Sequence, residues 1–133
     1  MGDCWFMAAA SALAEVPQRL ERIFLNDPGS MNKNGIYAVN IYTLGVPHTI
    51  VVDDYLPLQQ YWENAQYETL FSLVGEDTSM WGVILEKVFA KYHGNYEHLT
   101  AGDPRAAARS LMGSPSLQFV HSKDVSSEEF LWE

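Results

Sequence analysis

The chain has a single cysteine in a position where a thiol can act as a nucleophile. Cys4 follows Asp3 and opens a run rich in Ala, Leu and Met, which predicts a helix over Cys4–Glu15 with Asp3 as its N-cap. The first N–H groups of a helix and the positive end of its dipole favour a thiolate at this place. Such a thiolate attacks a carbonyl carbon once a histidine takes and returns the proton. These residue types therefore indicate acyl transfer, although a lone cysteine is more often a small buried hydrophobic residue.

Composition limits the classes of function. The 133 residues include 17 acidic and 8 basic side chains, and the resulting charge of −9 disfavours binding to nucleic acid or anionic lipid. One cysteine excludes an internal disulfide framework, and no apolar run is long enough for a membrane span. With 47% hydrophobic residues, the chain can bury the core of one domain. We therefore expect a soluble, acidic, intracellular domain.

The first half of the chain predicts two helices and a hairpin. A second helix is expected over Pro17–Phe24, and residues 26–35 have the composition of a loop. Tyr37, Val39 and Ile41 alternate within an expected strand, Ile36–Thr43. Leu44–Pro47 is turn material before a second, antiparallel strand over His48–Asp53, and Leu56–Gly75 is expected to be mostly irregular.

Two further helices and a short terminal one are expected after that region. Apolar residues recur at helical spacing from Met80 to Tyr92, with Ser79 or Thr78 as the cap, Gly94 at the end, and Glu86, Lys87 and Lys91 on the polar face. Asp103 and Pro104 begin a helix that runs to about Met112. Ser126 and Glu129 form a capping box for a last short helix. The fold class is α+β, mainly helical with a small antiparallel sheet.

Several segments resemble one family in order and spacing. Cys followed by an aromatic residue at a helix start is typical of papain-type nucleophile segments. Gly2–Phe6 with Ala8 and Ala9 resembles the nucleophile segment of calpains, the intracellular calcium-dependent cysteine proteases. Residues 34–37, the run VVDDYLP at 51–57 and the segment Trp81–Leu99 resemble three further calpain segments. The resemblance covers Gly2 to about Ser114.

The resemblance implies a papain-like half-domain and roles for three residues. Cys4 falls on the catalytic nucleophile, and Trp5 would help wall the cleft beside it. Gly102 falls on a glycine whose backbone pairs with extended polypeptide substrate, while Ala101 replaces a second glycine. Asp53, Asp54 and the neighbouring Glu86 and Lys87 are interpreted as structural, in salt bridges or caps.

Other catalytic groups are expected outside this chain. In the family, the oxyanion-hole Gln precedes the cysteine by about six residues, and the catalytic His and Asn belong to the second half of the protease core. None of His48, His93, His98 and His121 matches a catalytic position, so we interpret them as solvated or capping residues. Residues 1–133 are therefore expected to be a partial catalytic domain, truncated at both ends, whose partner half supplies His and Asn.

Calcium is a possible cofactor by the same resemblance. In calpains the first half-domain binds one ion through oxygens just before the cysteine and a Glu two residues before the tryptophan that aligns with Trp81. Here that position is Ser79, and a neutral hydroxyl is a poor Ca²⁺ ligand. Glu76 and Asp77 are nearby candidates that could replace it.

Three interpretations follow from these residues. The leading one is a fragment of a calpain-like cysteine endopeptidase, with a cytoplasmic location and polypeptide substrates, that is inactive without its second half. The alternative is a non-catalytic truncated module that binds a peptide or partner protein on a half-cleft lined by Trp5, Trp81 and Gly102. The third is a helical domain in which Cys4 and the tryptophans merely pack.

Overall fold

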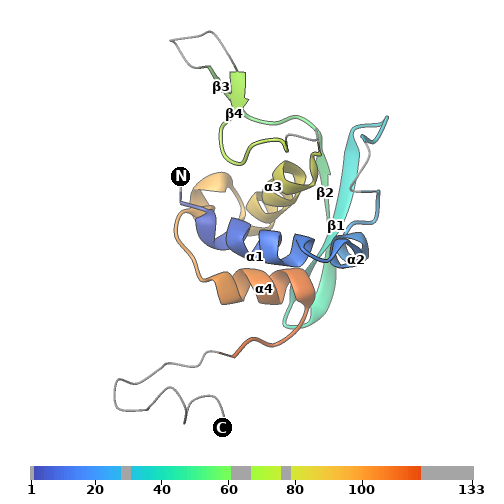
Figure 1. The fold of residues 1–133 in the computed structure, drawn as a ribbon, viewed down its shortest axis with the longest axis vertical. Helices are drawn as coiled ribbons and strands as arrows, with labels where there is room; N and C mark the ends of the chain where they lie inside the picture. Colours follow the sequence, from blue (N-terminus) through green and yellow to red (C-terminus); the bar gives the residue numbers. More distant parts are fainter. Residues whose placement is uncertain (1, 28–30, 61–66, 76–78, 118–133) are drawn as a thin grey trace.

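The computed structural model describes residues 2–27, 31–60, 67–75 and 79–117 (Figure 1). Within these residues the helices are α1 (Cys4–Ala14), α2 (Pro17–Ile23), α3 (Trp81–His93), the 3₁₀ helix η1 (Tyr96–Leu99) and α4 (Pro104–Met112). The strands are β1 (Ile36–Thr43), β2 (Val46–Asp53), β3 (Leu58–Gln60) and β4 (Tyr67–Thr69). The expected α+β class with antiparallel pairing is confirmed. The expected terminal helix at Ser126 lies outside the described residues.

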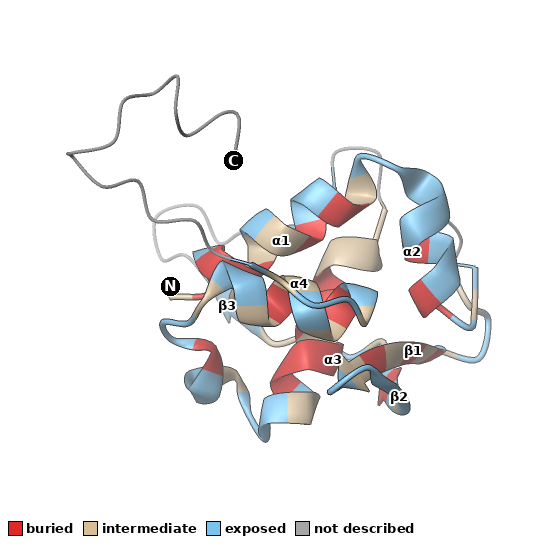
Figure 2. Cartoon of the chain, turned by 90° about the horizontal axis from the view of Figure 1, so that it is seen from below, coloured by how far each residue is buried: buried red, intermediate tan, exposed pale blue. Residues whose placement is uncertain are grey.

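The core lies between the helices and the first hairpin. Helix α3 contacts α1 on one side and strands β1 and β2 on the other, while α4 packs beside α1 and against β1. Phe6 of α1 and Phe89 of α3 are stacked with ring centroids 4.3 Å apart. Buried residues occur along α1, α3, α4 and β1, whereas α2 is largely exposed (Figure 2). Contacts between aromatic rings thus join the first helix to the third.

The first hairpin follows the predicted alternation. Tyr37, Val39 and Ile41 are buried, and β1 pairs with β2 in a register that sets Ile36 opposite Asp53. The turn between the strands is shorter than expected and consists of Leu44 and Gly45. Both residues have positive φ values, 51° and 82°. Strand β2 therefore begins at Val46 rather than at His48. A two-residue turn with both φ values positive matches the twist of paired strands.

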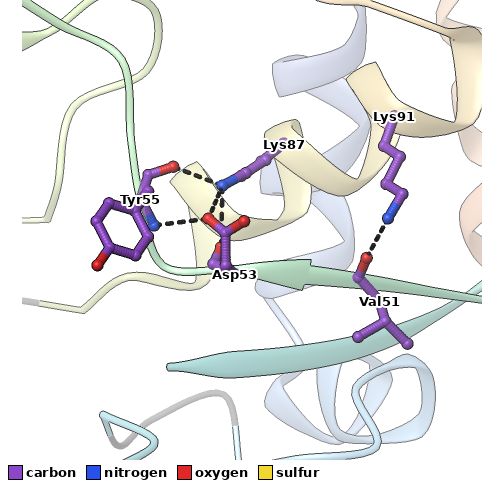
Figure 3. A network of polar contacts seen from close by, with 5 residues as sticks. All are labelled: Val51, Asp53, Tyr55, Lys87 and Lys91. Carbon is purple, nitrogen blue, oxygen red and sulfur yellow. Dashed lines mark hydrogen bonds and ion pairs between the residues drawn. The ribbon is translucent and has the colours of Figure 1, made fainter. Parts of the chain in front are cut away.

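Two lysines of α3 attach the helix to the end of β2 (Figure 3). Lys87 donates to the carboxylate and the carbonyl of Asp53 and to the carbonyl of Tyr55. Lys91 donates to the carbonyl of Val51 at 2.7 Å. The hydrogen bond from Lys87 holds the pKa of Asp53 below its ordinary value. The structural interpretation of Asp53 and Lys87 is confirmed by this salt bridge.

One expectation about local structure is confirmed in outline and another is wrong. The described part of Leu56–Gly75 lies mostly outside helices and strands, as expected, but β3 and β4 form a short second antiparallel sheet that stands at one end of the molecule (Figure 1). Three-residue strands with mainly exposed side chains lack the apolar alternation that identifies a strand. The N-cap of α3 is Met80, without a side-chain cap, rather than Ser79, and Thr78 lies outside the described residues.

Within the described ranges, no helix has the length and apolar character needed to cross a bilayer.

Removal of the Phe89 ring should destabilise the fold more than removal of any exposed ring. Phe89 is 1% exposed and touches both Phe6 and Trp5, so Phe89→Ala should lower the free energy of unfolding by about 3–5 kcal/mol. Chemical denaturation measures the loss. Tyr55, whose side chain is 82% exposed, provides the control, and Tyr55→Ala should cost less than about 0.5 kcal/mol. Equal losses in the two variants would contradict the assignment of the core.

Candidate active site around Cys4

The first turn of α1 presents the thiol of Cys4 to solvent. The carbonyl of Asp3 accepts hydrogen bonds from the backbone N–H groups of Phe6 and Met7, at 2.9 and 3.1 Å. Cys4 is the first residue of the helix and is exposed. The predicted helix start is therefore confirmed. Asp3 holds the N-cap position but makes no side-chain cap, because its carboxyl group is buried instead.

Trp5 and Gly102, which the sequence analysis assigned to substrate binding, are in contact with each other. Trp5 is only 9% exposed, and its indole Nε1 donates to the carbonyl of Leu99 at 2.8 Å. A Cβ atom placed on Gly102 would lie 2.3 Å from Cε2 of the Trp5 ring. The backbone at Gly102 therefore lies directly on the indole, as only a glycine allows.

The segment 99–102 is held against the chain just before Cys4. The N–H of Ala101 donates to the carbonyl of Gly2 at 2.9 Å. Ala101 has φ 65°, a left-handed conformation that glycine adopts more readily. The bond from Trp5 to Leu99 and the bond from Ala101 to Gly2 fix this segment next to the start of α1, where Cys4 lies. Tertiary structure thus brings together residues that are about 100 positions apart in the sequence.

Two buried carboxyl groups, those of Asp3 and Glu86, interact next to the start of α1, which the sequence pattern did not indicate. Glu86 of α3 was expected on the polar face, but it is 2% exposed, and Asp3 is 7% exposed. Burial, followed by the neighbouring carboxyl group of Asp3, raises the pKa of Glu86 to about 8. The N–H and the hydroxyl of Ser72 both donate to Oε2 of Glu86, which opposes the rise. The sequence did contain a signal of this burial. Glu86 is three residues after Val83 and three before Phe89, so it lies on the same helix face as these two apolar residues.

The three histidines of the described region are exposed, which agrees with their interpretation as solvated or capping residues. His48 is exposed on β2, and the ring of His93 packs against Phe89 at 4.6 Å. Nδ1 of His98 is 2.7 Å from the carbonyl of His93, and the N–H of His98 donates to the side chain of Asn95. Burial, and then the neighbouring His98, lower the pKa of His93. His121 lies outside the described residues.

The candidate calcium ligands cannot be placed. Glu76 and Asp77 lie outside the described residues, and the backbone carbonyl of Ser79 accepts from the N–H of Gly75 at 3.1 Å. Among the residues that the structure describes, no group of three or more His, Cys, Asp or Glu side chains could hold a metal ion. Calcium binding stays a prediction.

Comparison with known proteins shows the family to which the chain belongs. The family model for calpain family cysteine proteases matches residues 1–133. The chain belongs to the calpain family of cysteine proteases. It is 34% identical over 113 residues to the calpain-type cysteine protease ADL1 of Oryza sativa subsp. japonica and to the calpain-type cysteine protease DEK1 of Zea mays. It is 33% identical over 117 residues to calpain-10 of Mus musculus.

The matches cover most of this chain but little of the relatives. They include 85% of the chain for the two plant proteins and 86% for mouse calpain-10. The chain spans 5% of the length of each plant protein and 17% of the length of mouse calpain-10. The family is therefore established for this chain, whereas the activity of a whole calpain is not established by these matches.

Adjacent substitutions in the 99–102 segment should change stability in opposite directions. Gly102→Ala places a methyl group inside the Trp5 ring and should lower the free energy of unfolding by about 1–3 kcal/mol. Ala101→Gly relieves about 1–2 kcal/mol of left-handed strain and loses about 0.5–1 kcal/mol to chain entropy, so it should be slightly stabilising. Urea denaturation of both variants is the measurement. If Gly102→Ala leaves stability unchanged, Gly102 does not lie on the indole.

Proposed function

We propose that this chain is the nucleophile-bearing part of a calpain-type cysteine endopeptidase with a papain-like core. The observation that carries the proposal is the exposed Cys4 at the first position of α1, directly before a tryptophan that packs on Gly102. The thiol is the only one in the chain, and it lies at the point where the positive end of the helix dipole meets solvent. Membership of the calpain family supports polypeptide as the substrate class.

The proposed reaction is acyl transfer through Cys4. The Cys4 thiolate attacks the carbonyl carbon of the scissile peptide, and an S–C bond forms as the C–N bond breaks. A histidine of the second half of the core protonates the leaving amine, and water then hydrolyses the thioester. The asparagine of that half orients the histidine, as the third residue of other catalytic triads does.

The segment 99–102 has the properties needed to hold an extended substrate. Gly102 is exposed and has no side chain to obstruct a second backbone. The indole beneath it is held by its bond to Leu99, and the bond between Ala101 and Gly2 keeps the segment beside Cys4. An extended peptide aligned on Gly102 would therefore run past the thiol. Such positioning contributes to the rate because the reacting atoms are held at the right distance.

Calcium regulation and a cytoplasmic location form part of the same proposal. Both rest on membership of the calpain family and on the acidic composition, with Glu76 and Asp77 as the candidate ligands. Titration of the chain with Ca²⁺ in a calorimeter, with Glu76→Gln as the comparison, tests the first. The absence of binding heat in both proteins would remove calcium from the proposal.

The catalytic role of Cys4 is tested in the natural protein that carries this segment together with its second half. Hydrolysis of an unfolded protein substrate should fall by at least about 10³-fold in Cys4→Ala, because the nucleophile is lost. Ser11→Ala, an exposed substitution on the same helix, should retain full activity. Mass spectrometry should detect a thiol-reactive peptidyl inhibitor attached to Cys4. Full activity in Cys4→Ala would refute the proposal and leave the segment as a binding module.

A further inference from the structure

Two neighbouring hollows lie along the C-terminal half of α4. The first has a volume of about 510 Å³ and lies between α4, the end of α3 and the β1–β2 turn. The second has a volume of about 270 Å³ and lies between α2 and the last residues of α1 and α4. Tyr42 and Ser114 line both hollows, so the two form one continuous groove.

The groove collects positive charge in an acidic protein. Arg19 and Arg22 of α2 line the second hollow, and Arg109 of α4 lines the first, so we call it the arginine groove. All three side chains are exposed. Among the described residues, no Asp or Glu lines either hollow, although the chain has 17 acidic residues against 8 basic ones. The potential of the groove is therefore opposite in sign to that of the chain as a whole.

The three arginines of the groove have no carboxylate partner in the part of the chain that the structure describes. The ion pairs found there join Lys87 to Asp53 and Arg105 to Asp103. Arg109 acts on Asp103 through its charge alone, and it lowers the pKa of that carboxyl group less than Arg105 does. The guanidinium groups in the groove are thus available to a ligand, and their planar shape suits carboxylates.

Apolar and fixed side chains lie between the arginines. Met112 lines the second hollow and is 47% exposed. The chain leaves α4 at Gly113 against the ring of Tyr42, and a Cβ atom on Gly113 would lie 2.7 Å from Cδ1 of that ring. The hydroxyl groups of Thr43 and Tyr92 are 2.6 Å apart and fix one wall of the first hollow. The groove therefore offers a preformed apolar surface with positive charge in both hollows.

We propose that the arginine groove binds an acidic segment of another polypeptide in an extended conformation. A ligand that fills both hollows must be elongated, because it has to cross Tyr42 and Ser114. Carboxylates of the segment pair with the arginines, and an apolar side chain between them packs on Met112.

Electrostatics favours a short acidic segment over a membrane or a nucleic acid. The field of exposed charges is screened within about 8 Å at physiological ionic strength, so a segment in the groove is influenced mainly by the arginines. A membrane or a nucleic acid extends well beyond the groove and meets a surface that is acidic on average, since the net charge is −9. The same surface repels an acidic polypeptide elsewhere, which directs it to the groove.

The groove is separate from the nucleophile. Cys4 and Leu13, which lines the second hollow, lie near opposite ends of α1, about 14 Å apart along the helix axis (Figure 1). Binding in the groove therefore needs neither the thiol nor a second half of the protease core. The proposal does not rest on the proposed function.

The experiment measures binding to the full chain by the fluorescence anisotropy of a short labelled peptide, rich in glutamate with leucines at its centre. Arg22→Gln and Arg109→Gln should each weaken binding about two- to fivefold, and replacement of all three arginines at least about tenfold, because one exposed charge pair contributes little alone. The affinity should fall as the salt concentration rises. No saturable binding to the wild type would overturn the proposal.

Lys33→Gln is the matched control, because it removes the same charge from an exposed residue that does not line the groove. It should bind the peptide like the wild type. An equal loss of affinity in Lys33→Gln and Arg22→Gln would show that only net charge matters and would refute the site. The arginines are exposed, so their replacement should change the melting temperature little, and this is measured in every variant.

Nuclear magnetic resonance locates the bound peptide. In the ¹⁵N-labelled chain, the peptide should shift the amide resonances of Arg22, Arg109 and Met112. Shifts confined to the residues around Cys4 would contradict the groove and assign the acidic peptide to the proposed active site instead. Loss of proteolysis in the natural protein without any change in these shifts would refute the proposed function and leave the groove intact.

Two further probes test the chemistry of the ligand. A peptide in which serine replaces the leucines should bind more weakly, and equal affinity for both peptides would rule out the apolar contact with Met112. Vesicles that contain phosphatidylserine should bind more weakly than the peptide. Vesicle binding that depends on the three arginines, with no binding of the peptide, would overturn the proposal in favour of an anionic membrane.

Discussion

The packing of the first turn of α1 against α3 and η1 is the constraint on which the rest of the site depends. The indole of Trp5 is held edge-on to Phe89 and donates to the carbonyl of Leu99. Phe6 stacks on Phe89 in the next position of the helix. Because two consecutive residues of α1 both contact Phe89 and one of them is also bonded to Leu99, rotation of the helix would break these contacts. Cys4, which precedes them, is therefore exposed in a defined direction.

The first turn of α1 is held by two kinds of contact, one between buried aromatic rings and one between the buried carboxyl groups of Asp3 and Glu86. Burying aromatic rings stabilises the fold, whereas burying Asp3 and Glu86 costs free energy unless every polar atom finds a partner. An apolar pair at these positions would be simpler if stability were the only requirement. A costly polar pair next to the only thiol of the chain is the kind of local conflict that marks functional sites in proteins.

The elements around Cys4 are themselves held by contacts with the rest of the fold. Lys87 and Lys91 hold α3 on β2 (Figure 3). The same helix supplies the buried Phe89 and Glu86. Helix α4 packs along α1 and begins two residues after Gly102, so it holds the far end of the 99–102 segment. Each element that touches the first turn of α1 is thus fixed by a second set of contacts. Such rigidity is what the proposed alignment of an extended polypeptide on Gly102 requires.

The sequence by itself determined the elements whose signals are local. The helix that starts at Cys4, the alternation of Tyr37, Val39 and Ile41, and the Asp103–Pro104 start of α4 all follow from propensity, period or capping, and the structure confirms them. The family is also readable from ordered short segments. Tertiary structure decided the remainder: the contact of Trp5 with Gly102, the left-handed Ala101 and the burial of Glu86. Each of these depends on which distant backbone lies alongside. A sequence pattern assigns a glutamate to the polar face of a helix because of its charge, whereas residues of other elements that pack on the same face can bury it.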